Sequence, residues 1–269
     1  MKRLLILIVV LFAGCAETDQ LIDGIADQPS WKEIRDEVNS SGTITDAQAV
    51  VLSENKLPML YLDGLTSITD KQAEILSKFE NIYLNGLISI TDKQAELLCK
   101  QLANEVQGRT IGLDSLTSIN DKQSEFFSRV KILYLNGLTS ITDEQLANLS
   151  QVGNLSEIKG GKLHLDGLTS LTDKQAEILS KVENIYLNGL ISLTDKQVES
   201  LSKVPYGLWL DGLTSITDEQ AESLGKFEGG LSLNGLTSIT DKQAESLSKI
   251  GGLGISEALQ PLIDKYKKQ

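Results

Sequence analysis

Aromatic side chains recur at the middle position of a repeated Leu-x-Leu or Ile-x-Leu segment, where together they could form a binding surface. Along the chain this position holds Tyr61, Tyr83, Gly112, Tyr134, His164, Tyr186, Trp209 and Ser232. Five of the eight are aromatic, whereas an aromatic content of 5% would place about 0.4 there. Rigid, amphipathic rings suit recognition of a protein or a glycan. The alternative is that they only strengthen a sheet by cross-strand packing.

Two residues further on, a second column alternates between aspartate and asparagine. It contains Asp63, Asn85, Asp114, Asn136, Asp166, Asn188, Asp211 and Asn234. Its carboxylates, on Asp63, Asp114, Asp166 and Asp211, could present hydrogen-bond acceptors to a partner. The favoured alternative is turn chemistry, because Asp-Gly and Asn-Gly are preferred turn pairs in which glycine tolerates a positive φ. Calcium requires about six to eight oxygen ligands, which aspartates two strands apart do not jointly supply, so no metal site is expected.

Residues suited to catalysis are few. The chain has one histidine and two cysteines. His164 has no identifiable Ser or Cys nucleophile beside it, and Cys99 follows Leu98 on a helical pattern as a small packing residue. We therefore expect a protein that is not an enzyme and has no cofactor. A formal net charge of -12 also makes nucleic acid an unlikely partner, since its phosphates are bound by basic groups.

Both columns belong to one repeated unit. The aspartates that mark its period are separated by 22, 29, 22, 30, 22, 23 and 23 residues, and they are Asp70, Asp92, Asp121, Asp143, Asp173, Asp195, Asp218 and Asp241. In the first unit, Leu60-Tyr61-Leu62 alternates as a strand does, and Asp63-Gly64 predicts a turn. Thr69-Asp70-Lys71-Gln72 is a capping box that predicts a helix continuing through Leu76. Periods of this size indicate a solenoid.

The repeated pattern resembles a known family. From Leu57 to Leu76 the spacing of leucines and the Ile-Thr-Asp segment resemble the leucine-rich repeat, and are most similar to its cysteine-containing subtype. Leu65 and its equivalents stand where that subtype has Cys or Asn. The resemblance implies an α/β solenoid with short parallel strands on the concave face, short helices on the convex face and partner binding on the concave side.

The first residues predict an export signal. Lys2 and Arg3 precede a nine-residue apolar run from Leu4 to Phe12, which is too short to span a bilayer. The following Ala13-Gly14-Cys15 resembles the bacterial lipobox, in which Cys15 is acylated and becomes the first mature residue. This resemblance implies a lipid-anchored protein of the bacterial cell envelope. Ala16 directly after the cysteine favours the outer membrane over the inner one.

Five segments are expected along the chain. They are a signal peptide (1–14), a tether (15–29), an N-terminal cap (30–56), the solenoid (57–250) and a C-terminal cap (251–269). Two units carry insertions. The one after Cys99 is predicted to extend its helix, because Leu102 and Val106 continue the apolar face, and the one after Ser150 is predicted to be a loop.

The expected function is that of a non-catalytic envelope lipoprotein. Its solenoid is predicted to bind a protein or glycan through the concave aromatic column. The alternative is a structural spacer or surface-coat component without a specific ligand, for which near-identical repeats are equally good evidence. Residues 62–94 match residues 165–197 at all but three of thirty-three positions, which indicates growth by internal duplication.

Overall fold

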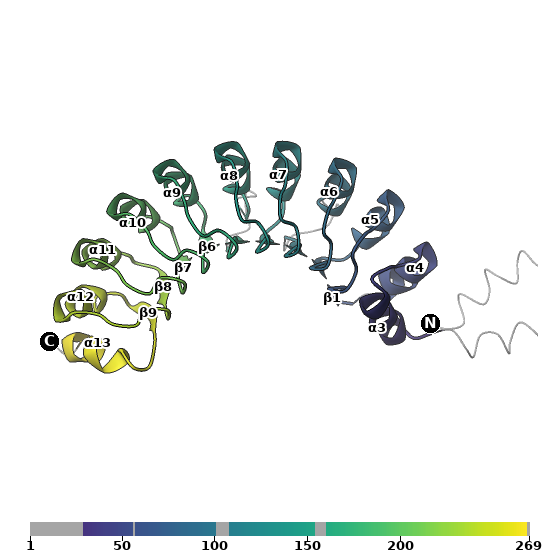
Figure 1. Ribbon diagram of the computed structural model, residues 1–269. Coiled ribbons are helices and arrows are strands. Elements are labelled where there is room, and N and C mark those ends of the chain that lie inside the picture. The colour runs from purple at the N-terminus through teal and green to yellow at the C-terminus, as the bar shows by residue number, and fades with distance from the viewer. Residues whose placement is uncertain (1–28, 56, 101–107, 154–159, 268–269) are drawn as a thin grey trace, which may run out of the picture.

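The computed structural model describes residues 29–55, 57–100, 108–153 and 160–267. Within this part, nine parallel strands form one sheet in sequence order, from β1 to β9. Figure 1 shows the chain as an arc, with the strands along its inner side and the helices along its outer side. The predicted α/β solenoid resembling leucine-rich repeats is confirmed.

The elements alternate regularly along the chain. The strands are β1 (Leu60–Tyr61), β2 (Asn81–Tyr83), β3 (Thr110–Gly112), β4 (Ile132–Tyr134), β5 (Lys162–His164), β6 (Asn184–Tyr186), β7 (Gly207–Trp209), β8 (Gly230–Leu233) and β9 (Gly252–Ile255). The helices are α3 (Trp31–Ser41), α4 (Asp46–Glu54), α5 (Asp70–Leu76), α6 (Asp92–Leu98), α7 (Asp121–Phe127), α8 (Asp143–Leu149), α9 (Asp173–Leu179), α10 (Asp195–Leu201), α11 (Asp218–Leu224), α12 (Asp241–Leu247) and α13 (Gln260–Lys267).

One continuous core joins the repeats. In the first unit Leu60, Leu62 and Leu65 enter it from the strand and turn, while Ala73 and Leu76 enter it from α5. The corresponding side chains of the later units are buried in the same way. Burying one large apolar side chain stabilises a fold by about 1.5 to 3 kcal/mol. Because each seven-residue helix is too short to be stable alone, stacking of the units stabilises it.

The predicted capping boxes all form. In α5 the hydroxyl of Thr69 accepts a hydrogen bond from the backbone N–H of Gln72, whose side-chain oxygen accepts one from the N–H of Thr69. Equivalent pairs begin every helix from α3 to α12. The capping side chains therefore fix the first residue of each helix.

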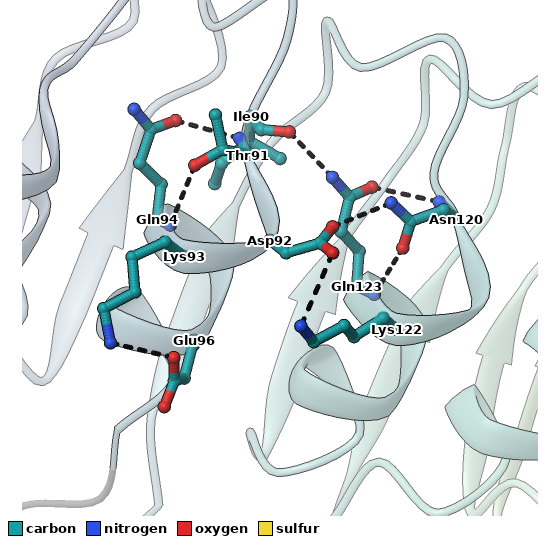
Figure 2. Close-up of polar contacts among 9 residues, drawn as sticks. All are labelled: Ile90, Thr91, Asp92, Lys93, Gln94, Glu96, Asn120, Lys122 and Gln123. Carbon is teal, nitrogen blue, oxygen red and sulfur yellow. Dashed lines mark hydrogen bonds and ion pairs between the residues drawn. The ribbon is translucent and has the colours of Figure 1, made fainter.

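The glutamine of each box from α5 onward also links neighbouring repeats, a role not anticipated from the sequence. Figure 2 shows Gln123 donating from Nε2 to the carbonyl oxygen of Ile90, at 2.7 Å, while its Oε1 accepts from the N–H of Asn120. The same cross-repeat bond is made by Gln72, Gln94, Gln145, Gln175, Gln197, Gln220 and Gln243. Glutamine supplies both a donor and an acceptor, whereas glutamate supplies only acceptors.

Exposed ion pairs also connect several helices with the preceding one. Lys122 lies 3.7 Å from Asp92 of the preceding helix, and the amide of Asn120 donates to the same aspartate (Figure 2). Similar pairs connect Lys71 with Asp46 and Lys174 with Asp143, each at 2.9 Å. Some of the helix lysines therefore form ion pairs between neighbouring repeats. Exposed pairs contribute little each, about 0 to 1 kcal/mol.

A helix lies at each described end of the solenoid, α3 at the N-terminal end and α13 at the C-terminal end (Figure 1). At the N-terminal end, Asn39 of α3 accepts from the N–H of Gly64 at 3.0 Å and donates to the carbonyl of Tyr61. Side chains of α3 thereby replace a preceding repeat at the edge of β1. At the other end α13 buries Ile263 in the core beside α12.

The described residues test only the first of the two expectations about the insertions. The predicted helix extension is wrong at its start, because α6 ends at Leu98 and Cys99 is its C-cap. Leu102 and Val106 fall in 101–107, outside the described residues, as does most of the insertion after Ser150. The buried guanidinium of Arg109, just beyond the first insertion, donates to the carbonyls of Leu98 and Ser77, so it joins the ends of two helices.

The segments predicted to direct and anchor the protein lie outside the described residues, including the signal peptide, Cys15 and nearly all of the tether. Within the described residues, no helix has the length and apolar character needed to cross a membrane. The five segment boundaries stay predictions.

Candidate binding face

The residues of the aromatic column lie side by side across the sheet. Tyr61 pairs with Tyr83, Tyr83 with Gly112, and Gly112 with Tyr134. The register continues through His164, Tyr186, Trp209 and Ser232. Leucines and isoleucines on either side of each column residue are buried, so the column residues point to the opposite face of the sheet, which is the inner side of the arc. The column residues of all eight repeats therefore share one register across the sheet.

The rings stack on one another instead of standing separately. Ring centroids are 4.0 Å apart for Tyr134 and His164, 3.7 Å for His164 and Tyr186, and 3.9 Å for Tyr186 and Trp209, with planes within 18°. Tyr61 and Tyr83 form a further stacked pair at 4.5 Å. Since strands lie about 4.8 Å apart, these rings lean together until their faces touch. We call Tyr61, Tyr83, Tyr134, His164, Tyr186 and Trp209 the ring row.

Gly112 interrupts the ring row without breaking it. Tyr83 and Tyr134 flank this glycine, and their rings approach to 5.7 Å with a tilt of 54°. A Cβ built at Gly112 would lie 2.8 Å from Cδ1 of Tyr83 and 2.6 Å from Oδ1 of Asn85. A larger residue would therefore displace the tyrosine that covers the glycine. The row is continuous because its one gap holds the smallest side chain.

Stacking determines which parts of the rings meet solvent. Tyr61, at the start of the row, is 43% exposed, and most of the other rings are half-buried. His164 is an exception with 8% exposure, because Tyr134 and Tyr186 cover both of its faces. His164 therefore offers little of its own surface to a partner. Between neighbours the row presents ring edges more than ring faces.

Burial also changes the acid–base properties of the row. Burial, followed by the positive charge of Lys162, lowers the pKa of His164 to about 4. Its Nε2 atom is buried without a hydrogen-bond partner among the described residues. Burial, with smaller contributions from Tyr134 and Tyr61, raises the pKa of Tyr83 to about 12. His164 and Tyr83 are thus both uncharged at neutral pH.

The aspartate and asparagine column forms a ladder between repeats. Oδ1 of Asp114 accepts from the backbone N–H of Asn136, and Oδ1 of Asn136 accepts from the N–H of Asp166. Such bonds, 2.8 to 3.3 Å long, link successive members from Asn85 to Asn234. Asp and Asn both supply this oxygen, which explains why either residue fits. We call this series the Asx ladder.

Glycine is required after the ladder residues for a reason other than the expected positive φ. The described glycines with positive φ are Gly42, Gly108, Gly153 and Gly160, and none of them follows a ladder residue. Instead, a Cβ at Gly137 would lie only 2.3 Å from the carbonyl oxygen of Asp114 in the preceding repeat. Close approach between turns, and not a left-handed backbone, therefore requires glycine here.

Asp114 and Asp166 of the ladder are partly buried. Burial raises the pKa of Asp114, and the hydrogen bond from the N–H of Asn136 opposes this effect. Burial likewise raises the pKa of Asp166, against the N–H of Asn188. Asp63, Asp114, Asp166 and Asp211 line the ring row on one side, so the sequence-predicted residues come together in two adjacent columns.

The remaining candidates for chemistry lie apart from this face. Cys99 is buried, and burial raises the pKa of its thiol to about 12, so the thiol stays protonated. Among the described residues, no group of three or more His, Cys, Asp or Glu side chains is arranged to hold a metal ion.

Comparisons with known proteins add little to these observations. No protein-family model matches the chain, and no curated protein matches it. Among solved structures, the chain is similar to the crystal structure of an internalin from Listeria monocytogenes, with a TM-score of 0.45 and 16% identity. The match covers 87% of this chain and 78% of that one. Similarity at this level transfers neither partner nor function, so the assignment of a repeat solenoid rests on the strand register and repeated helices of the chain itself.

Proposed function

We propose that the protein is a non-catalytic binding protein whose concave face, with the ring row at its centre, recognises a protein or glycan partner. The observation that carries the proposal is six rings held in one row on the inner face of the sheet, beside four aspartates. A rigid row of ring edges and hydroxyls offers contact area at a low entropic cost. A protein is the partner that we favour for the row as a whole.

The site of action proposed for this protein is the bacterial cell envelope, with the outer membrane favoured. Support comes from the apolar run Leu4 to Phe12 and from the lipobox-like Ala13-Gly14-Cys15. Acyl chains on Cys15 would hold the acidic chain at a membrane, at about 0.8 kcal/mol per buried CH₂. Replacing Cys15 by Ser should move the protein to the soluble fraction, and retention in the membrane fraction would reject acyl anchoring.

The binding proposal is tested by photo-crosslinking from two positions of similar exposure. A benzophenone amino acid replaces Tyr61, which begins the ring row and is 43% exposed, or Tyr206, which is 47% exposed and outside the row. We expect a discrete crosslinked product in the envelope from position 61 and none from position 206. Equal products from both positions, or none from either, would contradict recognition by the concave face.

The stacking itself favours a second candidate, a stiff spacer without a ligand. Ring faces contact one another, and each repeat bonds to the next through glutamine and the Asx ladder, so the row also rigidifies the arc. Replacing Tyr83, Tyr134 and Tyr186 by Ser separates the candidates. Loss of the position-61 crosslink with unchanged melting supports recognition, whereas a lowered melting temperature with an unchanged crosslink supports the spacer.

A further inference from the structure

The ring row ends at Trp209, and no other ring covers one face of its indole in the described residues. Tyr186 stacks on the opposite face at 3.9 Å with planes 8° apart. In the described residues Tyr186 is the single ring in stacking contact with Trp209. Beyond Trp209 the column continues with Ser232 on β8 and Gly254 on β9. The free face of the indole is therefore directed toward β8 and β9, where the column residues are only Ser232 and Gly254.

The strands beneath this face leave room beside the indole. Gly207, Gly230 and Gly252 lie side by side in β7, β8 and β9. The six-membered ring of Trp209 extends over Gly207, since a Cβ built there would lie 2.5 Å from Cζ3 of the indole. A Cβ at Gly230 would meet only backbone oxygens, at 3.9 and 4.0 Å. The surface next to the indole thus carries no side chain at that position.

The Asx ladder ends at the same place and leaves unused acceptors there. The N–H of Asn234 donates to Oδ1 of Asp211 at 2.8 Å, but the next strand is followed by Ser256, so the ladder has no further member. Oδ1 of Asn234 accepts no hydrogen bond from the described residues, and neither does Oδ2 of Asp211. Ser232 joins the two residues, donating to Asp211 at 2.6 Å and accepting from Nδ2 of Asn234 at 2.8 Å.

We propose that Trp209, Asp211, Ser232 and Asn234 form a subsite for one pyranose ring of a saccharide. The C–H face of the sugar packs on the free indole face, in the place that the next ring of the row would occupy over β8. Its hydroxyl groups donate to Oδ1 of Asn234 and Oδ2 of Asp211. An aromatic guest would cover the indole equally well but would leave both acceptors unpaired, so the polar rim favours a hydroxyl-bearing ring.

This subsite rests on the proposed function of the concave face and deepens it, by naming a ligand class for the C-terminal end of the ring row. Partner binding along the row requires ring edges from Tyr61 onward, whereas the subsite requires only the C-terminal end of the row. Crosslinking from position 61 and saccharide binding at Trp209 are therefore separate measurements, and either can fail alone.

The test uses the fluorescence of Trp209 in a chain with only two tryptophans. In a Trp31→Phe background, Trp209 is the sole reporter, and the probes are cellotriose and triacetylchitotriose, with mannitol as the open-chain control. We expect a saturable change in emission with at least one trisaccharide, at a Kd of about 1 mM, and none with mannitol. No saturable change with either trisaccharide up to about 50 mM would overturn the proposal.

Two variants locate the binding. Ser232→Tyr continues the ring row into the subsite and should abolish saccharide binding, whereas Ser238→Tyr adds a tyrosine at an exposed position of the same repeat and should leave it unchanged. Asn234→Ala removes the acceptor Oδ1 and should weaken saccharide binding several-fold. If Ser232→Tyr fails to fold, Asn234→Ala alone locates the site. Binding that survives both Ser232→Tyr and Asn234→Ala would place the sugar elsewhere. Preferential binding of N-acetyltyrosinamide over both trisaccharides would show a site for an aromatic ring instead.

Discussion

Nε2 of Gln123 donates to the carbonyl oxygen of Ile90, one repeat earlier, while its Oε1 caps the N-terminus of its own helix. One side chain thus fixes both where a helix begins and how two repeats stack. The same arrangement recurs in the repeats from Gln72 to Gln243. The capping box is therefore also the polar connection that sets the register of the solenoid.

This relationship predicts that Gln123→Glu destabilises the protein although glutamate is a good capping residue. The substitution removes the donor to Ile90 and places a carboxylate against a buried carbonyl, at a cost of about 1 to 3 kcal/mol. Urea denaturation at pH 7 measures the change. The matched control is Glu33→Gln in the box of Ser30, where only the side-chain oxygen is used, and the expected change there is under about 0.5 kcal/mol. Equal effects at both positions would contradict a role between repeats.

Close packing of turns predicts that alanine is tolerated at one glycine and rejected at another. A methyl group at Gly137 would overlap the carbonyl of Asp114, so Gly137→Ala should destabilise by about 1 to 3 kcal/mol. Gly251 has nothing within 4 Å of a built Cβ, so Gly251→Ala should be neutral or stabilise slightly. Melting temperatures of the two variants provide the comparison, and an unchanged Gly137→Ala would argue against the close approach.

The Asx ladder predicts that the acceptor oxygen of Asp166 matters more than its charge. Asp166→Asn keeps an oxygen that accepts from the N–H of Asn188. It also removes a partly buried carboxylate, whose pKa is raised by burial. The stability of this variant at pH 7 should therefore be unchanged or higher. Asp166→Ala removes the acceptor and should cost about 1 to 2 kcal/mol. If asparagine proved as harmful as alanine in thermal unfolding, the carboxylate and not the ladder bond would be the important feature.

His164 predicts a stability change in acid. Because its pKa is about 4 in the folded protein and near 6.5 when unfolded, the unfolded chain binds more protons between these values. The contribution of neutral His164 is complete above about pH 6.5 and is lost as the pH falls toward 4, by about 2 to 3 kcal/mol. Groups facing it are Tyr134, Tyr186 and Lys162.

The control for this prediction is His164→Phe, which keeps a stacked ring and removes the titration. Stability of both proteins is measured by urea denaturation from pH 7 to pH 4, so that losses shared through carboxylates cancel. We expect the wild-type protein to lose more stability than the variant across this range. Parallel curves would mean that His164 titrates alike in both states.

The architecture could be predicted because it depends on local, repeated signals. Thr69 and Gln72 define a helix start in the sequence, and Tyr61 between two leucines defines which way a strand faces. Contacts between repeats could not be predicted in the same way. The second bond of Gln123 and the approach of Gly137 to Asp114 depend on how closely the units stack, which no single repeat encodes.

The sequence predicted which residues form the column, but it did not predict how their rings pack. Strand alternation places Tyr134, His164 and Tyr186 on one face, but it does not say that their rings close upon one another and bury the histidine. That outcome follows from the distance between strands, which exceeds the thickness of a ring. The free face of Trp209 likewise depends on where the row stops.

The stacked ring row is tested most directly by NMR titration of the single histidine. With Tyr134 and Tyr186 on its two faces, the ring protons of His164 should be shifted upfield, and their titration should report a pKa of about 4. Ring protons at ordinary positions that titrate near pH 6.5 would contradict the row, because they would place the imidazole in solvent.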